Sequence, residues 1–238
     1  MLQDVNDLAK TNEDAENVLE DLGSSAVAFF ETEAKQFGTL ATRTDEVIVK
    51  HVVREVTGEL KAYMNKRWDG EAVAEDETGT GLSSELLSAL ALYSALLGSL
   101  VMSLPPSLLA PLQRRIGQAL AAYIEPRIAT SRVFSQAGGQ QILRDVEQGW
   151  IAAARDAGVT RAPEVAWAHL HDAALLLALP AGTTSGISIS KAMQAAWDTD
   201  LGSDIRLAKV LEQMGVTAMT ERKEVQAVLR KRPEVWKS

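Results

Sequence analysis

The chain has 238 residues, of which 46% are hydrophobic and 24% are charged, a balance typical of a folded globular protein. It contains no cysteine, which excludes disulfide bonds and cysteine-ligated zinc. The net charge of −8 is concentrated in residues 1–85, where 19 acidic side chains outnumber 8 basic ones. General binding to the phosphate backbone of a nucleic acid is therefore not expected.

Residues 1–68 are predicted to form two or three long amphipathic helices. They contain no proline, and apolar side chains recur at spacings of three and four from Ile48 to Leu60. Thr11 and Thr44 precede apolar residues and are predicted helix starts. The first residues are acidic and polar, which is unlike a signal peptide.

Residues 69–84 interrupt this pattern. They are acidic, rich in glycine, serine and threonine, and contain few apolar side chains to bury. We expect a flexible, solvated loop here, with an acidic interaction site as the alternative.

A run without any charged residue separates Glu85 from Arg114. A stretch of this length is a candidate for a membrane span. Three features argue against a membrane span: repeated serines, the Pro105-Pro106 pair and the lack of flanking aromatic or basic residues. We predict a helix that is apolar around most of its circumference and lies at the centre of a helical bundle.

Three further long helices are predicted, over residues 107–132, 136–157 and 163–179. Gly158 and Gly215 each follow a helical pattern and precede a valine, an arrangement typical of a left-handed helix end. Pro180 cannot continue the helix before it. Residues 85–180 are thus predicted to be a central helical bundle, and residues 181–238 a C-terminal bundle of short helices.

The histidines offer little chemistry. His169 and His171 stand two positions apart, so on a helix they point in different directions, and a structural role is predicted for both. His51 is predicted to be packed and hydrogen-bonded beside an apolar stripe. We expect no catalytic residue, no metal site and no cofactor.

The stretch from Gly138 to Trp150 contains two features with alternatives. The Gly138-Gly139 pair is predicted to permit close approach of two helices; binding an anion through backbone N–H groups is the alternative. Asp145 lies on a predicted buried face and needs a cation or several donors. The candidate cations are Arg144, Arg127 and Arg132.

The end of the chain is locally basic. Its cations are Arg222, Lys223, Arg230, Lys231, Arg232 and Lys237. A solvated helix face is predicted for them, with contact to an anionic surface as the alternative.

Several of these stretches together resemble one family. Residues 63–68 (YMNKRW), 134–150 (FSQAGGQQILRDVEQGW) and 171–180 (HDAALLLALP) resemble successive signature segments of RINT/TIP proteins. Residues 209–236 resemble that family's closing pair of short helices, and the order agrees over most of residues 20–236. The motif positions, for which structural roles are expected, are Trp68, Phe134, Gly138, Gly139, Asp145, Trp150 and Pro180. Family members are considerably longer, so the chain is expected to be their C-terminal portion.

The resemblance implies an all-α fold, an elongated CATCHR-like stack of helical bundles. It also implies a non-catalytic subunit of the Dsl-type vesicle-tethering complex, which acts in Golgi-to-ER retrograde transport. Such a subunit would bind ER SNARE proteins and sister tether subunits, and would be cytoplasmic, peripheral on the ER membrane and without a transmembrane span. Two rivals remain: a helical module that binds a lipid or other apolar ligand between residues 86–104 and 170–179, and a membrane-inserted hairpin over residues 86–113.

Overall fold

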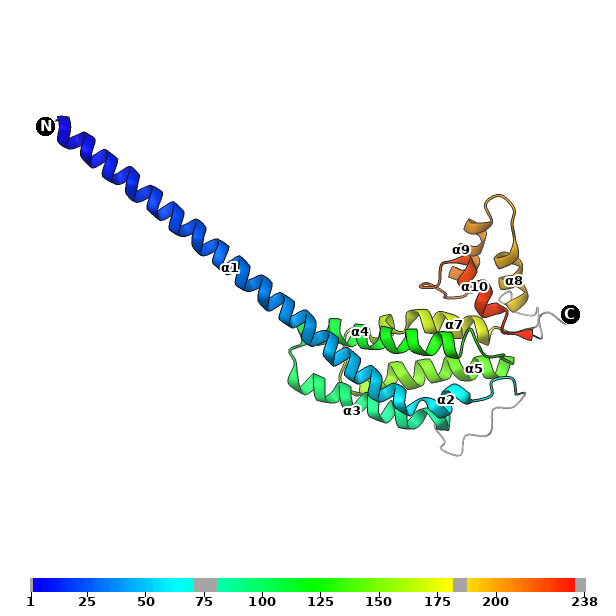
Figure 1. The fold of residues 1–238 in the computed structure, drawn as a ribbon. Coiled ribbons are helices and arrows are strands. Elements are labelled where there is room, and N and C mark those ends of the chain that lie inside the picture. The colour runs from blue at the N-terminus through cyan, green and yellow to red at the C-terminus, as the bar shows by residue number, and fades with distance from the viewer. Residues whose placement is uncertain (1, 71–80, 182–187, 234–238) are drawn as a thin grey trace. The chain divides into compact units, whose positions relative to one another are not determined.

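The computed structural model describes the backbone of residues 2–70, 81–181 and 188–233, and side chains from Phe30 onward within these ranges. The chain divides into two compact units, Met1–Ile48 and Val49–Ser238. Helices make up the secondary structure of the described residues, apart from one isolated bridge between Trp68 and Phe134 (Figure 1). The predicted all-α fold is confirmed.

The α-helices follow one another along the chain. They are α1 (Leu2–Glu59), α2 (Lys61–Asn65), α3 (Leu87–Ser103), α4 (Pro106–Ile124), α5 (Gln136–Arg144), α6 (Ala152–Asp156), α7 (Ala168–Ala178), α8 (Ile189–Trp197), α9 (Ser203–Gln213) and α10 (Arg222–Leu229). A π-helical segment, Asp145–Ile151, joins α5 to α6. The predicted limits of the domains, at residues 68, 84 and 180, stay predictions.

Residues 2–48 of the unit Met1–Ile48 form one uninterrupted stretch of helix α1. The helix starts predicted at Thr11 and Thr44 are wrong, because α1 continues through both. The hydroxyl of Thr44 donates to the carbonyl oxygen of Leu40, one turn earlier, at 2.9 Å. A threonine bonded in this way is satisfied inside a helix and does not need to cap a new one.

The unit Val49–Ser238 begins with the last turns of α1, followed by α2. Val52, Val56 and Leu60 are buried, which confirms the apolar face predicted from their spacing. His51 is instead exposed and contacts Arg54, with 3.3 Å between its Nδ1 and a guanidinium nitrogen. The prediction that His51 is packed is wrong, because it lies on the opposite, charged face of α1.

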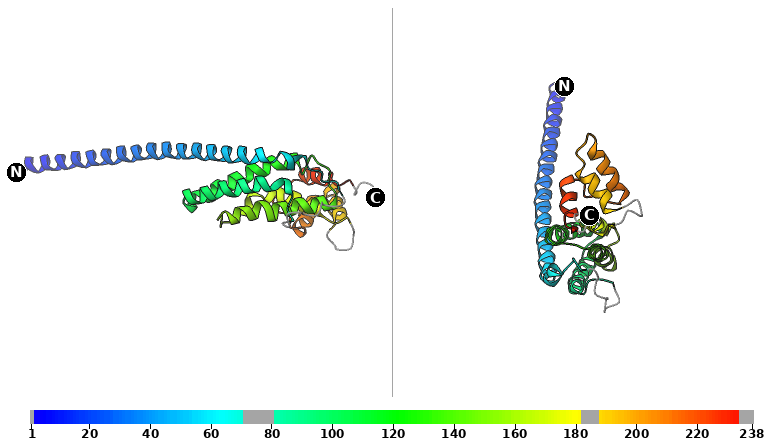
Figure 2. Two further views of the ribbon diagram at one scale, coloured as in Figure 1. Left: turned by 90° about the horizontal axis from the view of Figure 1, so that it is seen from below. Right: turned by 90° about the vertical axis from the view of Figure 1, so that its right-hand side faces the viewer.

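In the same unit, α3, α4, α5 and α7 lie side by side as a helical bundle, seen end-on in the right-hand view of Figure 2. The most enclosed of them is α7, which packs along α5 and also contacts α4 and α10. Its side chains from Leu170 to Leu177 are mostly buried. The centre of the bundle is therefore α7.

The prediction that α3 lies at the centre is wrong. Only one stripe of α3 is buried, formed by Ala89, Leu90, Tyr93 and Leu97, while Met102 is 88% exposed. In the described chain, one helical stretch, Ser84–Ser103, is long and apolar enough to cross a membrane by length and composition alone, and 28% of it is buried. Lack of charge does not by itself place a helix in the core, since serines and alanines tolerate solvent on its outer side.

The helix ends predicted from glycine and proline are confirmed. Gly158 and Gly215 both have positive φ, at 95° and 78°. The valine after each glycine donates its N–H to a carbonyl of the helix, as in Val159 to Ala154 at 3.0 Å. One predicted end is wrong: α4 stops at Ile124 rather than near residue 132, because Pro126 falls in the tight turn that follows.

The last three helices form a group at one end of the bundle (Figure 1). α8 packs against α9, and α10 packs against both α8 and α7. Two hydrogen bonds hold the described ends of the connection before α8. The N–H of Ile189 donates to the carbonyl oxygen of Pro180 at 3.0 Å, and the N–H of Ala181 donates to the side-chain oxygen of Gln136 at 3.3 Å.

Candidate functional site

Three of the motif positions, Trp68, Phe134 and Gly138, come together between the end of α2 and the start of α5. The N–H of Ser135 donates to the carbonyl oxygen of Trp68 at 2.9 Å, beside the bridge between Trp68 and Phe134. The Trp68 ring lies 5.5 Å from the Phe134 ring and meets Tyr63 edge-on at 5.3 Å. Segments 66 residues apart in the sequence are thus joined by backbone and aromatic contacts.

The two glycines of α5 are sites of close backbone approach. A Cβ on Gly138 would clash with the carbonyl oxygen of Trp68, and one on Gly139 would clash with that of Leu177 on α7. The Gly138 N–H bonds the Ser135 hydroxyl at 3.1 Å, and the Gly139 N–H bonds the Ser135 carbonyl at 3.0 Å. The predicted close approach is confirmed, and both N–H groups are already used within the protein rather than presented to an anion.

Asp145 is fully buried and accepts hydrogen bonds from neutral groups. Its Oδ1 accepts from the Ser83 N–H at 2.9 Å and from Gln141 at 3.0 Å. Its Oδ2 accepts from the Ser83 hydroxyl at 2.6 Å and from the Tyr63 hydroxyl at 3.0 Å. Burial raises the pKa of Asp145, and these four hydrogen bonds oppose part of that rise.

Of the two predicted ways to satisfy Asp145, several donors rather than a cation are found. The candidate cations Arg144, Arg132 and Arg127 bond the carbonyl oxygens of Gly81, Met64 and Tyr123 respectively. Two cations reach the carboxylate through neutral side chains. Lys66 donates to the Ser83 hydroxyl at 2.9 Å and pairs with Glu85 at 3.0 Å, and Arg144 donates to the side-chain oxygen of Gln141 at 3.3 Å.

Part of the predicted flexible loop belongs to this site. Residues 71–80 lie outside the described residues, but Gly81 to Ser84 are described. Ser83 is buried and supplies two of the four donors to Asp145. The composition of residues 69–84 gave no signal for this, because a serine that binds a distant carboxylate looks like any other loop serine.

Trp150 anchors a second cluster, in which three helical segments meet. Its ring stacks on Trp167 at 4.8 Å and meets Tyr93 of α3 edge-on at 5.4 Å. All three side chains are fully buried, and burial raises the pKa of Tyr93 to about 12. The π-helical segment carries both Asp145 and Trp150, and such segments re-aim side chains relative to a regular α-helix.

The basic tail is only partly a solvated face. Arg232 is fully buried and donates to the carbonyl oxygens of Leu177 and Leu179, at the end of α7. Arg222 donates to the carbonyls of Ala195 and Ala196, at the end of α8, at 3.0 and 2.9 Å. The prediction of solvation is thus wrong for these two, while Lys223 and Arg230 are exposed and Lys237 lies outside the described residues.

The histidines on α7 do point apart, as predicted. His169 lies between two carboxylates, with its Nδ1 2.8 Å from Glu125 and its Nε2 3.4 Å from Glu224. His171 instead contacts Glu147 at 3.0 Å. Among the described residues, no group of three or more acidic or histidine side chains is placed to hold a metal ion.

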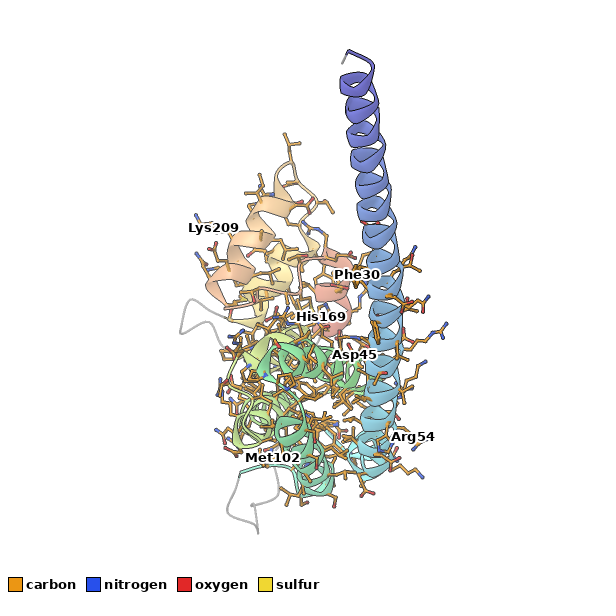
Figure 3. All side chains as sticks on the ribbon, turned by 90° about the vertical axis from the view of Figure 1, so that its left-hand side faces the viewer. Phe30, Asp45, Arg54, Met102, His169 and Lys209 are labelled. Carbon is orange, nitrogen blue, oxygen red and sulfur yellow. The ribbon has the colours of Figure 1, made fainter. Side chains whose placement is uncertain are left out.

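Accessible apolar side chains lie on helices and in turns. In the unit Met1–Ile48, three side chains of α1 are more than half exposed, namely Phe30 (Figure 3), Phe37 and Leu40. In the unit Val49–Ser238, Leu201 and Ile205 at the start of α9 are exposed, and a shallow groove runs between α4 and α7. Residues 86–104 and 170–179, between which an apolar ligand was the alternative expectation, line neither this groove nor the hollow beside Phe37 and Leu40 on α1.

Comparison with known proteins identifies one family. Residues 1–232 match the RINT-1/TIP-1 family. Searches of curated proteins and of solved structures returned no match. Since the family match covers nearly the whole chain, the chain belongs to the RINT-1/TIP-1 family, a family of tethering-complex subunits.

Proposed function

We propose that this protein is a non-catalytic subunit of a vesicle-tethering complex of the Dsl type, acting in Golgi-to-ER retrograde transport. It binds the N-terminal domains of ER SNARE proteins and sister tether subunits. It works in the cytoplasm, peripherally on the ER membrane. The observation that carries this proposal is the family match over residues 1–232.

The described contacts support an associative role. The polar side chains of the motif segments are used inside the protein: Asp145 holds a loop to α5, and Arg232 covers the end of α7. These residues stabilise the fold and leave the helix surfaces for partners. A subunit of this kind acts by binding and holding, so its affinity for partners is the quantity to measure.

The charge distribution suggests how partners are selected. Residues 1–85 are strongly acidic, whereas residues 86–238 carry a slight excess of bases. Charges of this kind increase the rate of association with a partner of opposite charge, and this attraction weakens as the salt concentration rises. We infer that the acidic half associates with basic surfaces on its partners.

The test is crosslinking mass spectrometry and pull-down with ER SNARE N-terminal domains and sister subunits, at low and high salt. We expect capture that weakens at high salt, with crosslinks on helix surfaces. The double variant Phe37→Ser/Leu40→Ser removes exposed apolar area from α1 and should reduce capture; Thr39→Ser/Thr42→Ser, on the same helix, is the control. If the wild-type chain captures none of these partners, the proposed function is wrong.

A further inference from the structure

The groove between α4 and α7 is lined by small side chains from four separate segments. Its walls include Ala121 and Ala122 of α4, Val165 and Ala166 before α7, Ala168 at its start, and Ala218 from the connection before α10. We call it the alanine groove. Its volume is about 520 Å³. Because alanines line it, another backbone can approach closely, as in helix–helix contacts that bury small residues.

One end of the alanine groove is acidic. Glu125 and His169 both line it, and Glu224 lies on the other side of the imidazole. Each carboxylate bonds the ring through one oxygen, Oε2, although an ionised carboxylate can accept about four hydrogen bonds. Arg127, just past the end of α4, donates to the carbonyl oxygen of Tyr123 at 2.8 Å, so the acidic character of this end comes from the carboxylates alone.

We infer that the alanine groove is a docking site for an amphipathic helix of a partner protein that carries a lysine or arginine beside its apolar face. The apolar face of such a helix would cover the alanines and Val165, which is 44% exposed. The cation would lie next to Glu125 and extend its hydrogen bonding. Helix-in-groove recognition of this kind relies on apolar anchors at helical spacing and on charges at the rim.

Charge complementarity identifies this occupant among the alternatives. Glu125 and His169 at the groove end, with Glu224 on the far side of the imidazole, form a cluster of two carboxylates and one imidazole. This cluster is anionic whether or not His169 is protonated. An acidic segment or an anionic lipid headgroup would be repelled, and a neutral apolar ligand would leave the carboxylates without a new partner. The inference rests on the proposed function in one respect only, namely that the protein works by binding partner proteins.

The probe is a labelled synthetic helix of about 14 residues made of leucine, alanine and lysine, with leucines at i, i+3, i+4 and i+7 and lysines beside them. A matched peptide has glutamate in place of lysine. Fluorescence anisotropy measures affinity, and amide chemical shifts of the labelled protein locate the site. We expect the lysine peptide to bind more tightly than the glutamate peptide, with shifts at Ala122, Ala168 and Ala218.

Two variants test the groove and its acidic end separately. Ala122→Trp fills the groove from an exposed position and should weaken the lysine peptide about tenfold or more. Ala208→Trp, at an exposed alanine of α9, is the matched control and should leave affinity unchanged. Glu125→Gln should weaken binding of the lysine peptide about two- to fivefold, as expected for the loss of a partly exposed ion pair. Neither the circular-dichroism spectrum nor the unfolding midpoint of this variant should improve on wild type.

The inference is overturned if the lysine peptide does not bind, if both peptides bind alike, or if Ala122→Trp binds as wild type does. Pull-down with SNARE domains and sister subunits separates this outcome from the proposed function. Capture that survives Ala122→Trp shows that partners dock elsewhere, while the tethering role stands. Failure of wild type to capture them counts against the tethering role, whatever the peptides do.

Discussion

The carbonyl oxygen of Trp68 occupies the space in which a side chain on Gly138 would begin, and the carbonyl oxygen of Leu177 does the same to Gly139. Two successive glycines thus receive the backbone of two different segments. Neither contact can be relieved by rotating a side chain, because both partners are main-chain atoms.

Substituting either glycine should therefore destabilise the fold. We expect Gly138→Ala and Gly139→Ala each to lower the free energy of unfolding by at least about 1–3 kcal/mol, the usual cost of overpacking. Gly38→Ala is the control, because a Cβ there meets nothing within 4 Å and alanine favours helix by about 1 kcal/mol. Chemical denaturation of the three variants measures the difference. Equal midpoints for Gly139→Ala and wild type would contradict the close approach.

Asp145 should be needed as an acceptor more than as a charge. Asp145→Ala leaves the Ser83, Gln141 and Tyr63 donors unsatisfied and should cost about 3–5 kcal/mol of unfolding free energy. Asp145→Asn keeps one acceptor and allows the two hydroxyls to accept, so it should cost much less. If alanine and asparagine are equally damaging, the hydrogen-bond account is wrong.

Wild type and Asp145→Asn should also differ in the pH dependence of their stability. Because burial raises the folded-state pKa of Asp145, the folded protein holds that proton more tightly than the unfolded chain does. Ionising the group therefore costs stability, and that cost grows as pH rises from the unfolded pKa of about 4 to the raised folded value. The stability of wild type relative to Asp145→Asn should fall over this window. Denaturation midpoints of both proteins at a series of pH values test the sign.

Arg232 should contribute to stability, whereas an exposed basic residue of the same tail, such as Lys223, should not. Arg232→Met removes two charge-assisted hydrogen bonds to α7 carbonyls and should cost about 2–4 kcal/mol. Lys223→Met, at an exposed position of α10, should change stability by no more than about 0.5 kcal/mol. Thermal and chemical unfolding of the two variants provide the comparison. Similar small effects would mean that Arg232 is solvated after all.

His169 should titrate above its ordinary range. Burial lowers its pKa, but hydrogen bonds and charge from Glu125 and Glu224 outweigh this, and the net shift is upward. The stabilisation is thus fully present below the unfolded pKa of about 6.5 and is lost as pH rises through the raised folded value. Glu125→Gln should lower the pKa of His169, and Glu221→Gln, an exposed control, should not. NMR titration of the imidazole signals measures both.

Local features of the structure were predictable from sequence, and through-space ones were not. Gly158, Gly215 and Pro180 end helices because of their own backbone chemistry, so their effect is visible without knowing the fold. The donors to Asp145 include Ser83 and Tyr63, 62 and 82 residues away, and no short-range pattern links them. The same holds for Arg232 and the end of α7.

Other errors arose where one sequence pattern fits more than one environment. The uncharged stretch containing α3 is compatible with a core helix, a membrane span or a helix buried along one stripe, and the third is found. Thr44 resembles a helix start, yet its hydroxyl is equally satisfied within a helix. In both cases the sequence limits the choices, and packing decides among them.

The two arginines that cover the ends of α7 and α8 both come later in the chain than the helices they complete. During synthesis, α7 and α8 must therefore leave the ribosome with exposed terminal carbonyls, which stay hydrated until residues 222 and 232 emerge. The native arrangement of this unit can be reached only after residue 232 has emerged, so its final assembly is a late event rather than a stepwise one.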